Sequence, residues 1–514
     1  MLLNTTSKII CMTENQVKDI LLMYKENQQK KTVRLPNIYS LNRWLKKEYQ
    51  EFCMVGSINE NYRILNGIEE KILWEKIIKN DLKGDKFQKN QIDSIIEKVI
   101  SADQKIREYR IKNIELKDYI FTVEGRKFNK WLDQFKNHCT EKKLLSKINF
   151  IEFFIEKQIK FNIVNDQELM LVGFDDKKPL YEELISVLNE KNKIKEHRCK
   201  EEKIKRLQEI QCENVEAEIK EITQWVSQNP NKKLLIISPA LSKYQTKLVN
   251  ELDREIQPDI YNDYDKNNIY NSNLQRPLSK EPIVIAAINL LKLNNADQTN
   301  TKLFYESLIF NNWIDSNEYQ DREQLANYIN SKKIPKISVT LLIKLINNDP
   351  KVKELNLDLL VKTLSLIKKN QSLWRGKKEI SEWINLTEQY WNEIKIFKVN
   401  NLLMFEISNI ERLLKSLNQV KNNQIIDYPI IFEEYWEILF TQLSSWPAHI
   451  DEVDSYIDIK GFEENPIKKY DAIWLMNMNT NFCPGKTEFN PFISEKLQKK
   501  YHIFDEVYTK KIES

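Results

Sequence analysis

Glycine is scarce in this chain. Its 514 residues include eight glycines, and the two closest, Gly56 and Gly67, are eleven positions apart. A P-loop needs two glycines five positions apart, a Rossmann turn needs them two and three apart, and a serine-hydrolase nucleophile elbow needs them four apart. Because none of these spacings occurs, the sequence excludes most ATP-, NAD- and serine-hydrolase functions.

Cysteine and histidine are few and scattered. The six cysteines include no C-x-x-C pair, and none of the four histidines has a second histidine three or four positions away. Zinc and iron–sulfur sites are usually built from such close pairs. We therefore expect reduced, mostly buried thiols, and no metal ion or other cofactor.

A strong charge imbalance and long apolar runs are also missing. Lys and Arg total 79 against 75 Asp and Glu, a net charge of +4. This balance argues against a polybasic binder but is compatible with a local nucleic-acid groove. The apolar runs are too short to span a membrane, and the N-terminus lacks the basic and apolar regions of a signal peptide. We expect a cytoplasmic protein of two to four domains.

Strand-like apolar runs alternate with long helical stretches. Helical periodicity dominates residues 66–156 and 279–442. A mixed charge run, Lys191–Arg206, is predicted to be a solvated connector. Strands are expected at Lys8–Met12, Leu169–Val172, Leu234–Ile237, Tyr456–Lys460 and Ile473–Met476. The layout is therefore sheet, helical insertion, sheet, helical insertion, sheet.

Residues 168–189 look like a nucleotide-hydrolysis motif without its hydrolytic residues. The strand Leu169–Val172 ends at Gly173, and Pro179 opens a helix, so the loop between them lies where open α/β sheets bind ligands. Phosphoryl transfer requires a carboxylate on this strand to hold Mg²⁺ and a second group to position water. Val172 and Gly173 occupy those positions. The sequence therefore predicts the strand, loop and helix of a nucleotide site without the residues that hold Mg²⁺ and position water.

The first strand-to-helix junction also lacks the residues that a nucleotide site requires. Thr13 and Gln16 form a predicted capping box that starts a helix through about Tyr24. A helicase core would carry its phosphate loop here, but the junction has no glycine, and its first lysine is Lys18.

Two acidic patterns could be taken for metal sites. Asp175 and Asp176 are predicted instead to cap the following helix and complement its dipole. Asp458 and Lys460, with Asp454 upstream, fit the D…(D/E)-x-K pattern of a nuclease, but such short patterns occur by chance in a chain rich in acids and lysines. We predict no catalytic, cofactor-binding or metal site.

A basic stretch at residues 368–378 is the candidate DNA-binding patch. Its candidate residues are Lys368, Lys369, Trp374, Arg375, Lys377 and Lys378. Cations beside an aromatic ring are typical of single-strand binding. The alternative, which the sequence favours, is a solvated turn whose tryptophan packs locally. Trp383, Tyr390 and Trp391 recur at helical spacing and are expected in the core.

This alternation of sheet and helix resembles the superfamily 1 helicase core of the UvrD/RecB type, and most closely the AddB-like group of probable DNA-repair proteins. The segments that carry the likeness are Ile64–Trp74, Glu124–Phe128 with Trp131 and Phe135, Gly173–Asp175 with Pro179, Glu216–Trp225, Leu234–Pro239, Gly461–Glu463, Tyr470–Leu475, Pro484 and Asn490–Phe492. These motifs span nearly the whole chain but are individually short.

The resemblance implies an α/β fold, helix-dominated overall, with two RecA-like (P-loop NTPase-type) parallel-sheet domains. The first would cover residues 1–210 with a helical insertion at about 66–160. The second would cover 211–514 with an insertion at about 280–445, and would be truncated at its C-terminus. The implied function is that of a catalytically degenerate helicase-like DNA-repair protein. Its implied partners are DNA, as double-stranded ends or a single strand, and a nuclease or helicase subunit.

Three departures from the family pattern concern ATP hydrolysis. The phosphate loop is missing at Cys11–Gln16, the motif II carboxylates are replaced, and the γ-phosphate arginine aligns with Ser238 and Pro239. The chain also ends at Ser514, before the family's C-terminal PD-(D/E)xK nuclease domain would begin. Two alternatives therefore stay open: a truncated or split part of an active exonuclease, and a protein–protein scaffold without DNA binding.

Overall fold

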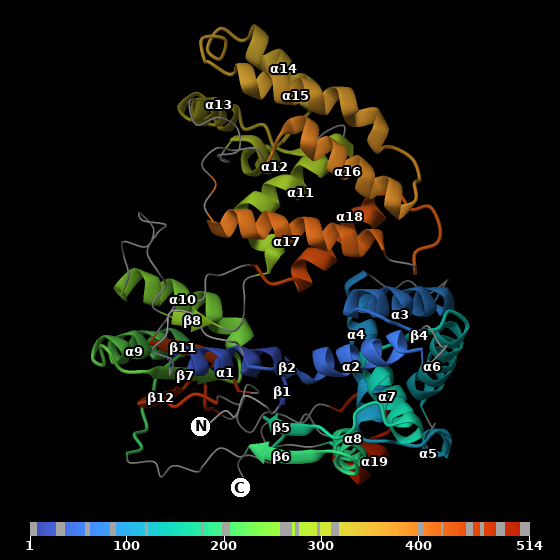
Figure 1. Cartoon of the computed structure of the whole chain (residues 1–514). Helices are drawn as coiled ribbons and strands as arrows, with labels where there is room; N and C mark the ends of the chain where they lie inside the picture. The colour runs from blue at the N-terminus through green and yellow to red at the C-terminus, as the bar shows by residue number, and fades with distance from the viewer. Residues whose placement is uncertain are drawn as a thin grey trace. The chain divides into compact units, whose positions relative to one another are not determined.

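A computed structural model shows a helix-dominated α/β protein with parallel sheets. The chain divides into two compact units, residues 1–274 with 453–514 and residues 275–452 (Figure 1). The described residues are 8–26, 36–56, 62–82, 89–118, 122–175, 178–197, 206–256, 270–272, 277–295, 299–309, 318–397, 402, 404–422, 425–448, 456–462, 467–479 and 489–503.

The first unit contains a four-stranded parallel sheet of order β2-β1-β5-β6. The strands are Ile38–Ser40, Lys8–Cys11, Glu168–Val172 and Lys193–His197. The strands predicted at Lys8–Met12 and Leu169–Val172 are thus confirmed as β1 and β5. Helices cover both faces of this sheet. Because side chains on both faces of the two central strands are therefore buried, the sequences of these strands are nearly continuous apolar runs.

Side-chain alternation divides the core of this sheet between its two faces. Ile10 and Leu171 pack with helices α2, α7 and α8, which are Leu41–Met54, Lys147–Phe161 and Pro179–Asn189. Cys11 and Val172 point to the opposite face, where helix α1 (Glu14–Glu26) covers them. This arrangement places the start of α1 beside the carboxyl ends of β1 and β5.

The edge strand β6 lies where a solvated connector was predicted, so that prediction is wrong for residues 193–197. Residues 193–197 lie within the expected solvated connector Lys191–Arg206, yet they pair in parallel with the whole of β5. The segment is charged because it is an exposed edge, and lysine on an edge strand discourages pairing with other chains. Residues 198–205 lie outside the described residues.

The helices expected between the first sheet strands are present. They are α3 (Gly67–Asp81), α4 (Lys89–Glu108), α5 (Asn113–Asp118) and α6 (Val123–Glu141), followed by α7. Trp74 of α3 stacks on Phe135 of α6 with ring centroids 4.2 Å apart. A short parallel pair, β3 (Arg63–Ile64) with β4 (Leu144–Leu145), joins the start of α3 to the start of α7.

A second parallel sheet in the same unit has the order β12-β7-β11-β8. Its strands are Ala472–Leu475, Leu234–Ser238, Ile457–Gly461 and Tyr270–Ser272. Helices α9 (Val215–Ser227) and α10 (Leu241–Ile256) share its core. The predicted strands at 234–237, 456–460 and 473–476 are confirmed to within a residue or two.

The second unit is helical apart from a short antiparallel pair, β9 (Thr299–Asn300) with β10 (Lys336–Ile337). Helix α11 (Pro282–Asn295) is apolar on all sides and buried at its centre. The other principal helices are α13 (Tyr319–Ser331), α14 (Val339–Asn348), α15 (Asp358–Asn370), α16 (Ile380–Ile394), α17 (Met404–Lys421) and α18 (Phe432–Ser445).

The predicted domain boundary at residues 210 and 211 falls between β6 and α9, and the assignment of two RecA-like domains stays a prediction. Among the described residues, no helix has both the length and the apolar character needed to cross a bilayer.

Candidate functional site

The junction between β1 and α1 is closed by the predicted capping box. The Thr13 backbone N–H donates to Gln16 Oε1 over 3.1 Å, and the Gln16 backbone N–H donates to Thr13 Oγ1 over 3.3 Å. Helix N-termini bind phosphate through backbone N–H groups that have no intrahelical partner. Here one such group is already bonded, and Glu14 places a negative charge in the first turn of α1. The junction is therefore poorly suited to a phosphate.

Gln16 also lies against the end of β5. Gly173, directly after that strand, has a φ of +79°, and a Cβ added to it would lie 2.1 Å from Gln16 Nε2. Glycine is needed at this position both for its backbone conformation and for the close approach of the amide. The Gln16 side chain is only 5% exposed. The protein's own amide thus fills the space at the strand ends.

The structure places no carboxylate at the carboxyl end of β5, and the acidic residue of this strand, Glu168, lies at its other end and pairs with Lys195. Val172 is buried, and Asp175 is exposed. The helix after the loop is capped differently from the prediction, because the N-cap of α8 is Lys178, whose side chain makes no capping bond. The predicted capping role of Asp175 is therefore wrong, since the helix begins too far along the chain, while Asp176 lies outside the described residues. No metal-binding group of three or more His, Cys, Asp or Glu occurs within the described part of the chain.

The Cys11 thiol at the end of β1 is not a nucleophile. It is fully buried, and burial raises its pKa to about 12, with Glu14 and Asp19 adding to the shift. At neutral pH the thiol therefore stays protonated, and the thiolate is the reactive form. The other described cysteines are also free thiols: Cys53, Cys139 and Cys212. Cys199 and Cys483 lie outside the described residues.

A buried ion-pair network joins α1 to the second sheet. Lys460 Nζ of β11 lies 2.6 Å from Asp19 Oδ2 of α1, and their side chains are 4% and 9% exposed. Lys468 Nζ lies 3.9 Å from Asp19 Oδ1 and 3.4 Å from Asp458 Oδ2. The Tyr470 hydroxyl donates to the same Asp458 oxygen over 2.6 Å. Each buried charge thus has a partner, which buried ions require.

This network gives the Asp458-x-Lys460 pattern a structural role. Asp458 accepts from Tyr470 and pairs with Lys468, while Lys460 pairs with Asp19. Lys460 therefore holds β11 to α1, and Asp458 holds β11 to the segment that contains Lys468 and Tyr470. The network was missed from the sequence, because Asp19 and Lys460 are 441 positions apart and no local pattern links them.

The end of β7 is also occupied by internal contacts. Ser238, at the position where the resemblance places an arginine, is 1% exposed, and its hydroxyl donates to Asn477 Oδ1 over 2.9 Å. The Asn477 backbone N–H donates in turn to Glu218 Oε1 over 3.0 Å. Glu218 comes from α9, so three segments meet here and enclose the Ser238 hydroxyl.

The candidate DNA-binding stretch lies in the second unit, where its aromatic and basic parts are separated. Lys368, Lys369, Arg375 and Lys377 are exposed, and Lys378 is half-buried. Lys378 Nζ donates to the Arg375 carbonyl over 2.6 Å and lies 4.5 Å from the Trp383 ring centroid. Lys368 and Lys369 lie in the last turn of α15, and Arg375, Lys377 and Lys378 lie in the connection from α15 to α16.

Trp374 is enclosed in the core of the second unit. Its side chain is 0% exposed, and its ring lies 5.9 Å from the Trp383 ring, with Tyr390 and Phe432 also in contact. The proposed stacking role of Trp374 is thus wrong for this structure, because neither ring face is open to a base. The core positions predicted for Trp383, Tyr390 and Trp391 are confirmed.

Comparison with known proteins adds no family assignment: no family model matches the chain, and no curated protein matches its sequence.

Proposed function

We propose that this chain is a catalytically inactive, helicase-like DNA-repair protein of the AddB-like kind, acting as a scaffold that binds DNA. In this proposal the two parallel sheets of the first unit correspond to the two RecA-like domains of a superfamily 1 helicase. The alternation of strands and long helical stretches along the chain, with helices α3–α7 between β2 and β5, supports this proposal.

The observation that carries the proposal is the closed junction at the strand ends. Gln16 lies over Gly173 in the place of a phosphate loop, and β5 ends without a carboxylate. The Asp19–Lys460 pair ties the helix after this junction to the second sheet. A motor must open and close between its two sheets during each cycle of nucleotide turnover, and a buried ion pair at that position opposes such movement.

The contribution of such a protein is electrostatic and stacking contact with DNA, without ATP turnover. Its expected partners are double-stranded ends or single strands, together with a nuclease or helicase subunit. The cytoplasm is the compartment in which the proposed function would be performed.

Two assays on the full chain test this function. A gel shift with blunt and tailed duplexes at two salt concentrations should show binding that weakens steeply as salt rises, because phosphate contacts release counterions. A DNA-stimulated ATPase assay should show no turnover above background. Failure to bind any DNA would support the protein–protein scaffold instead, and DNA-stimulated hydrolysis would contradict the inactive site.

A further inference from the structure

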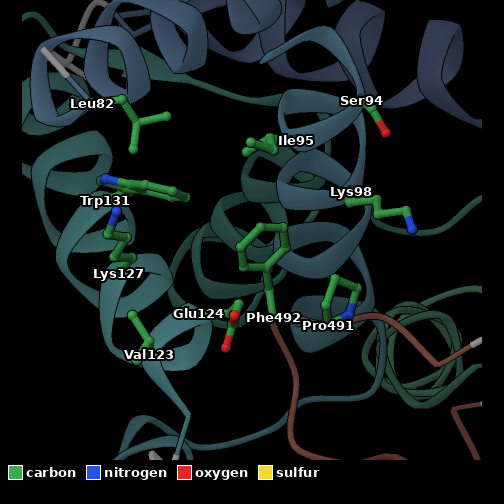
Figure 2. A pocket seen from close by; sticks show the side chains of 10 residues that line it. All are labelled: Leu82, Ser94, Ile95, Lys98, Val123, Glu124, Lys127, Trp131, Pro491 and Phe492. Carbon is green, nitrogen blue, oxygen red and sulfur yellow. The ribbon is translucent and has the colours of Figure 1, made fainter. Parts of the chain in front are cut away.

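A cavity of about 370 Å³ lies between helices α4 and α6 of the first unit (Figure 2). Its volume is near the lower end of the range for small-molecule sites, about 300–1,000 Å³. Leu82 and Trp131 line one side, and Ile95 lines the other. Phe492, from a segment almost 400 positions further along the chain than α4, lies between the two helices. The walls are therefore largely apolar and partly aromatic.

The segment that carries Phe492 is fixed by hydrogen bonds. Asn490 Nδ2 donates to the Lys98 carbonyl of α4 over 2.8 Å, and Asn490 Oδ1 accepts from the Phe492 backbone N–H over 3.0 Å. Gln498, which is fully buried, accepts from the Asn490 backbone N–H and donates to its carbonyl, each over 2.9 Å. This wall is built before any ligand arrives, which lowers the entropy cost of binding.

Polar groups line the cavity beside these apolar walls. Lys98 of α4 is exposed, Lys127 of α6 is half-buried, and the two come from opposite sides of Phe492 (Figure 2). The side chain of Lys98 has no hydrogen-bond or ion-pair partner among the residues that the structure describes. Glu124, which is exposed, adds a carboxylate to the lining. Ser94 of α4 adds a hydroxyl, so the site combines an apolar slot with two cations, a carboxylate and a hydroxyl.

We propose that this cavity holds one unstacked base of a DNA strand, with the flanking backbone phosphates on Lys98 and Lys127. The inference rests on the proposed DNA binding and gives that function a site. Apolar and aromatic walls favour a planar base, because every base has a π face that can pack against the part of the Phe492 ring that Phe128 and Trp131 leave uncovered. The two lysines supply the cations that phosphates require.

An acidic peptide that ends in an aromatic residue also fits a basic, aromatic pocket. Glu124 favours a base over such a peptide. A carboxylate in the lining accepts hydrogen bonds from the amino groups of adenine, cytosine or guanine. The aromatic side chain of phenylalanine has no donor for this carboxylate and would leave it without the hydrogen bond that a base supplies. The hydrogen-bonding groups of the cavity therefore favour a base.

The first test is single-strand binding, followed by fluorescence anisotropy of a labelled oligonucleotide over a series of salt concentrations. The variant is Lys98→Gln with Lys127→Gln, and its matched control is Lys142→Gln with Lys191→Gln, two exposed lysines of the same unit outside the cavity. The plot of log K against log salt has a negative slope. Loss of two phosphate contacts should make this slope shallower by about 1.4, while the control retains the wild-type slope.

The second test addresses the base itself. A strand that carries one 2-aminopurine should change fluorescence on binding when the base enters the cavity. Phe492→Leu keeps apolar volume and removes the ring face, so it should weaken binding by about fivefold or more and reduce that change. A thermal melt verifies that each variant is folded, and neither lysine of the double variant is a core residue.

The outcomes separate the two proposals. A wild-type chain that binds no DNA overturns the proposed function and this site with it. A wild-type chain that binds DNA while the double lysine variant matches its control overturns this site alone. A short acidic peptide ending in phenylalanine is run in parallel. The cavity is a peptide site if this peptide binds the wild type but not the double lysine variant, while both proteins bind DNA equally well. That result excludes a base as the ligand of the cavity.

Discussion

Lys460 and Asp19 form a buried ion pair across 441 positions of sequence, with Nζ and Oδ2 2.6 Å apart. Lys460 lies on β11 of the second sheet, and Asp19 lies on α1, which covers one face of the first. Ile467 packs against that same face beside α1. The two sheets of the first unit are thus joined by a buried ion pair between α1 and β11.

Breaking this pair should be costly. Asp19→Asn leaves the buried Lys460 without its ion-pair partner, which should lower the free energy of unfolding by about 3–5 kcal/mol. Lys460→Met leaves Asp19 with the more distant Lys468 alone, so its loss should be similar or smaller. The double variant Asp19→Leu with Lys460→Met should lose much less, because the charges that remain, Lys468 and Asp458, still pair with each other. Urea unfolding measures all three. Glu216→Gln, which breaks an exposed pair with Lys247, is the control and should have no measurable effect. Single variants as stable as the control would contradict the role of the pair.

Gly173→Ala should destabilise the chain for two separable reasons. The backbone conformation, with φ at +79°, is strained for alanine, and the new Cβ would collide with Gln16. Gly56 has the same φ of +79° and no neighbour within 4 Å, so Gly56→Ala carries the backbone cost alone. We expect the Gly173 variant to lose about 1–3 kcal/mol more than the Gly56 variant in urea unfolding.

Combining Gly173→Ala with Gln16→Ala should then recover part of that loss, because truncating Gln16 makes room for the Cβ. Equal losses at the two glycines, or no recovery in the double variant, would show that Gln16 does not lie against the strand end.

Stability should depend on pH through Glu70 of α3. Burial raises the pKa of this carboxyl to about 7 from its ordinary value of 4.5, and Asp103 adds to the shift. The folded state therefore holds a proton that the unfolded state has lost, so stability falls as pH rises from about 4.5 to about 7 and is constant above. Each tenfold change in proton affinity corresponds to about 1.4 kcal/mol, so a pKa raised from 4.5 to about 7 lowers the stability by roughly 3.5 kcal/mol in total.

Glu70→Gln removes the titrating group and should reduce this loss. Unfolding at pH 5 and pH 8 measures it, and the wild type should lose more stability between these values than the variant. Parallel pH profiles for the two proteins would rule out the protonated carboxyl.

Trp374 should behave as a core residue. Trp374→Ala removes a fully buried ring and should cost about 3–5 kcal/mol in unfolding free energy. Its neighbour Leu373 is 50% exposed, so Leu373→Ala is a control with a much smaller expected effect. A Trp374 variant of normal stability but lower DNA affinity would restore the stacking role.

Local signals in the sequence predicted much of this structure. The capping box of Thr13 and Gln16, the apolar run of β5 and the proline that opens α8 each depend on residues within a few positions of one another. The buried stripe that contains Trp383 and Tyr390 follows from helical spacing in the same way.

Features set by distant contacts were beyond such reasoning. The strand β6 is charged because it lies at an edge, and its pairing with β5 is visible only once the sheet is formed. The Asp19–Lys460 pair and the enclosure of Trp374 depend on which segments the fold brings together. The cavity at Phe492 likewise combines two helices with a segment far along the chain.

The inactive nucleotide site is tested most directly by titrating the purified chain with Mg–ATP in a calorimeter, with and without a DNA duplex. We predict no saturable binding in either case, because Gln16 fills the strand ends and no carboxylate lies at the carboxyl end of β5 to hold the metal ion. Saturable micromolar binding of Mg–ATP would contradict the inactive site, most clearly if DNA strengthened it.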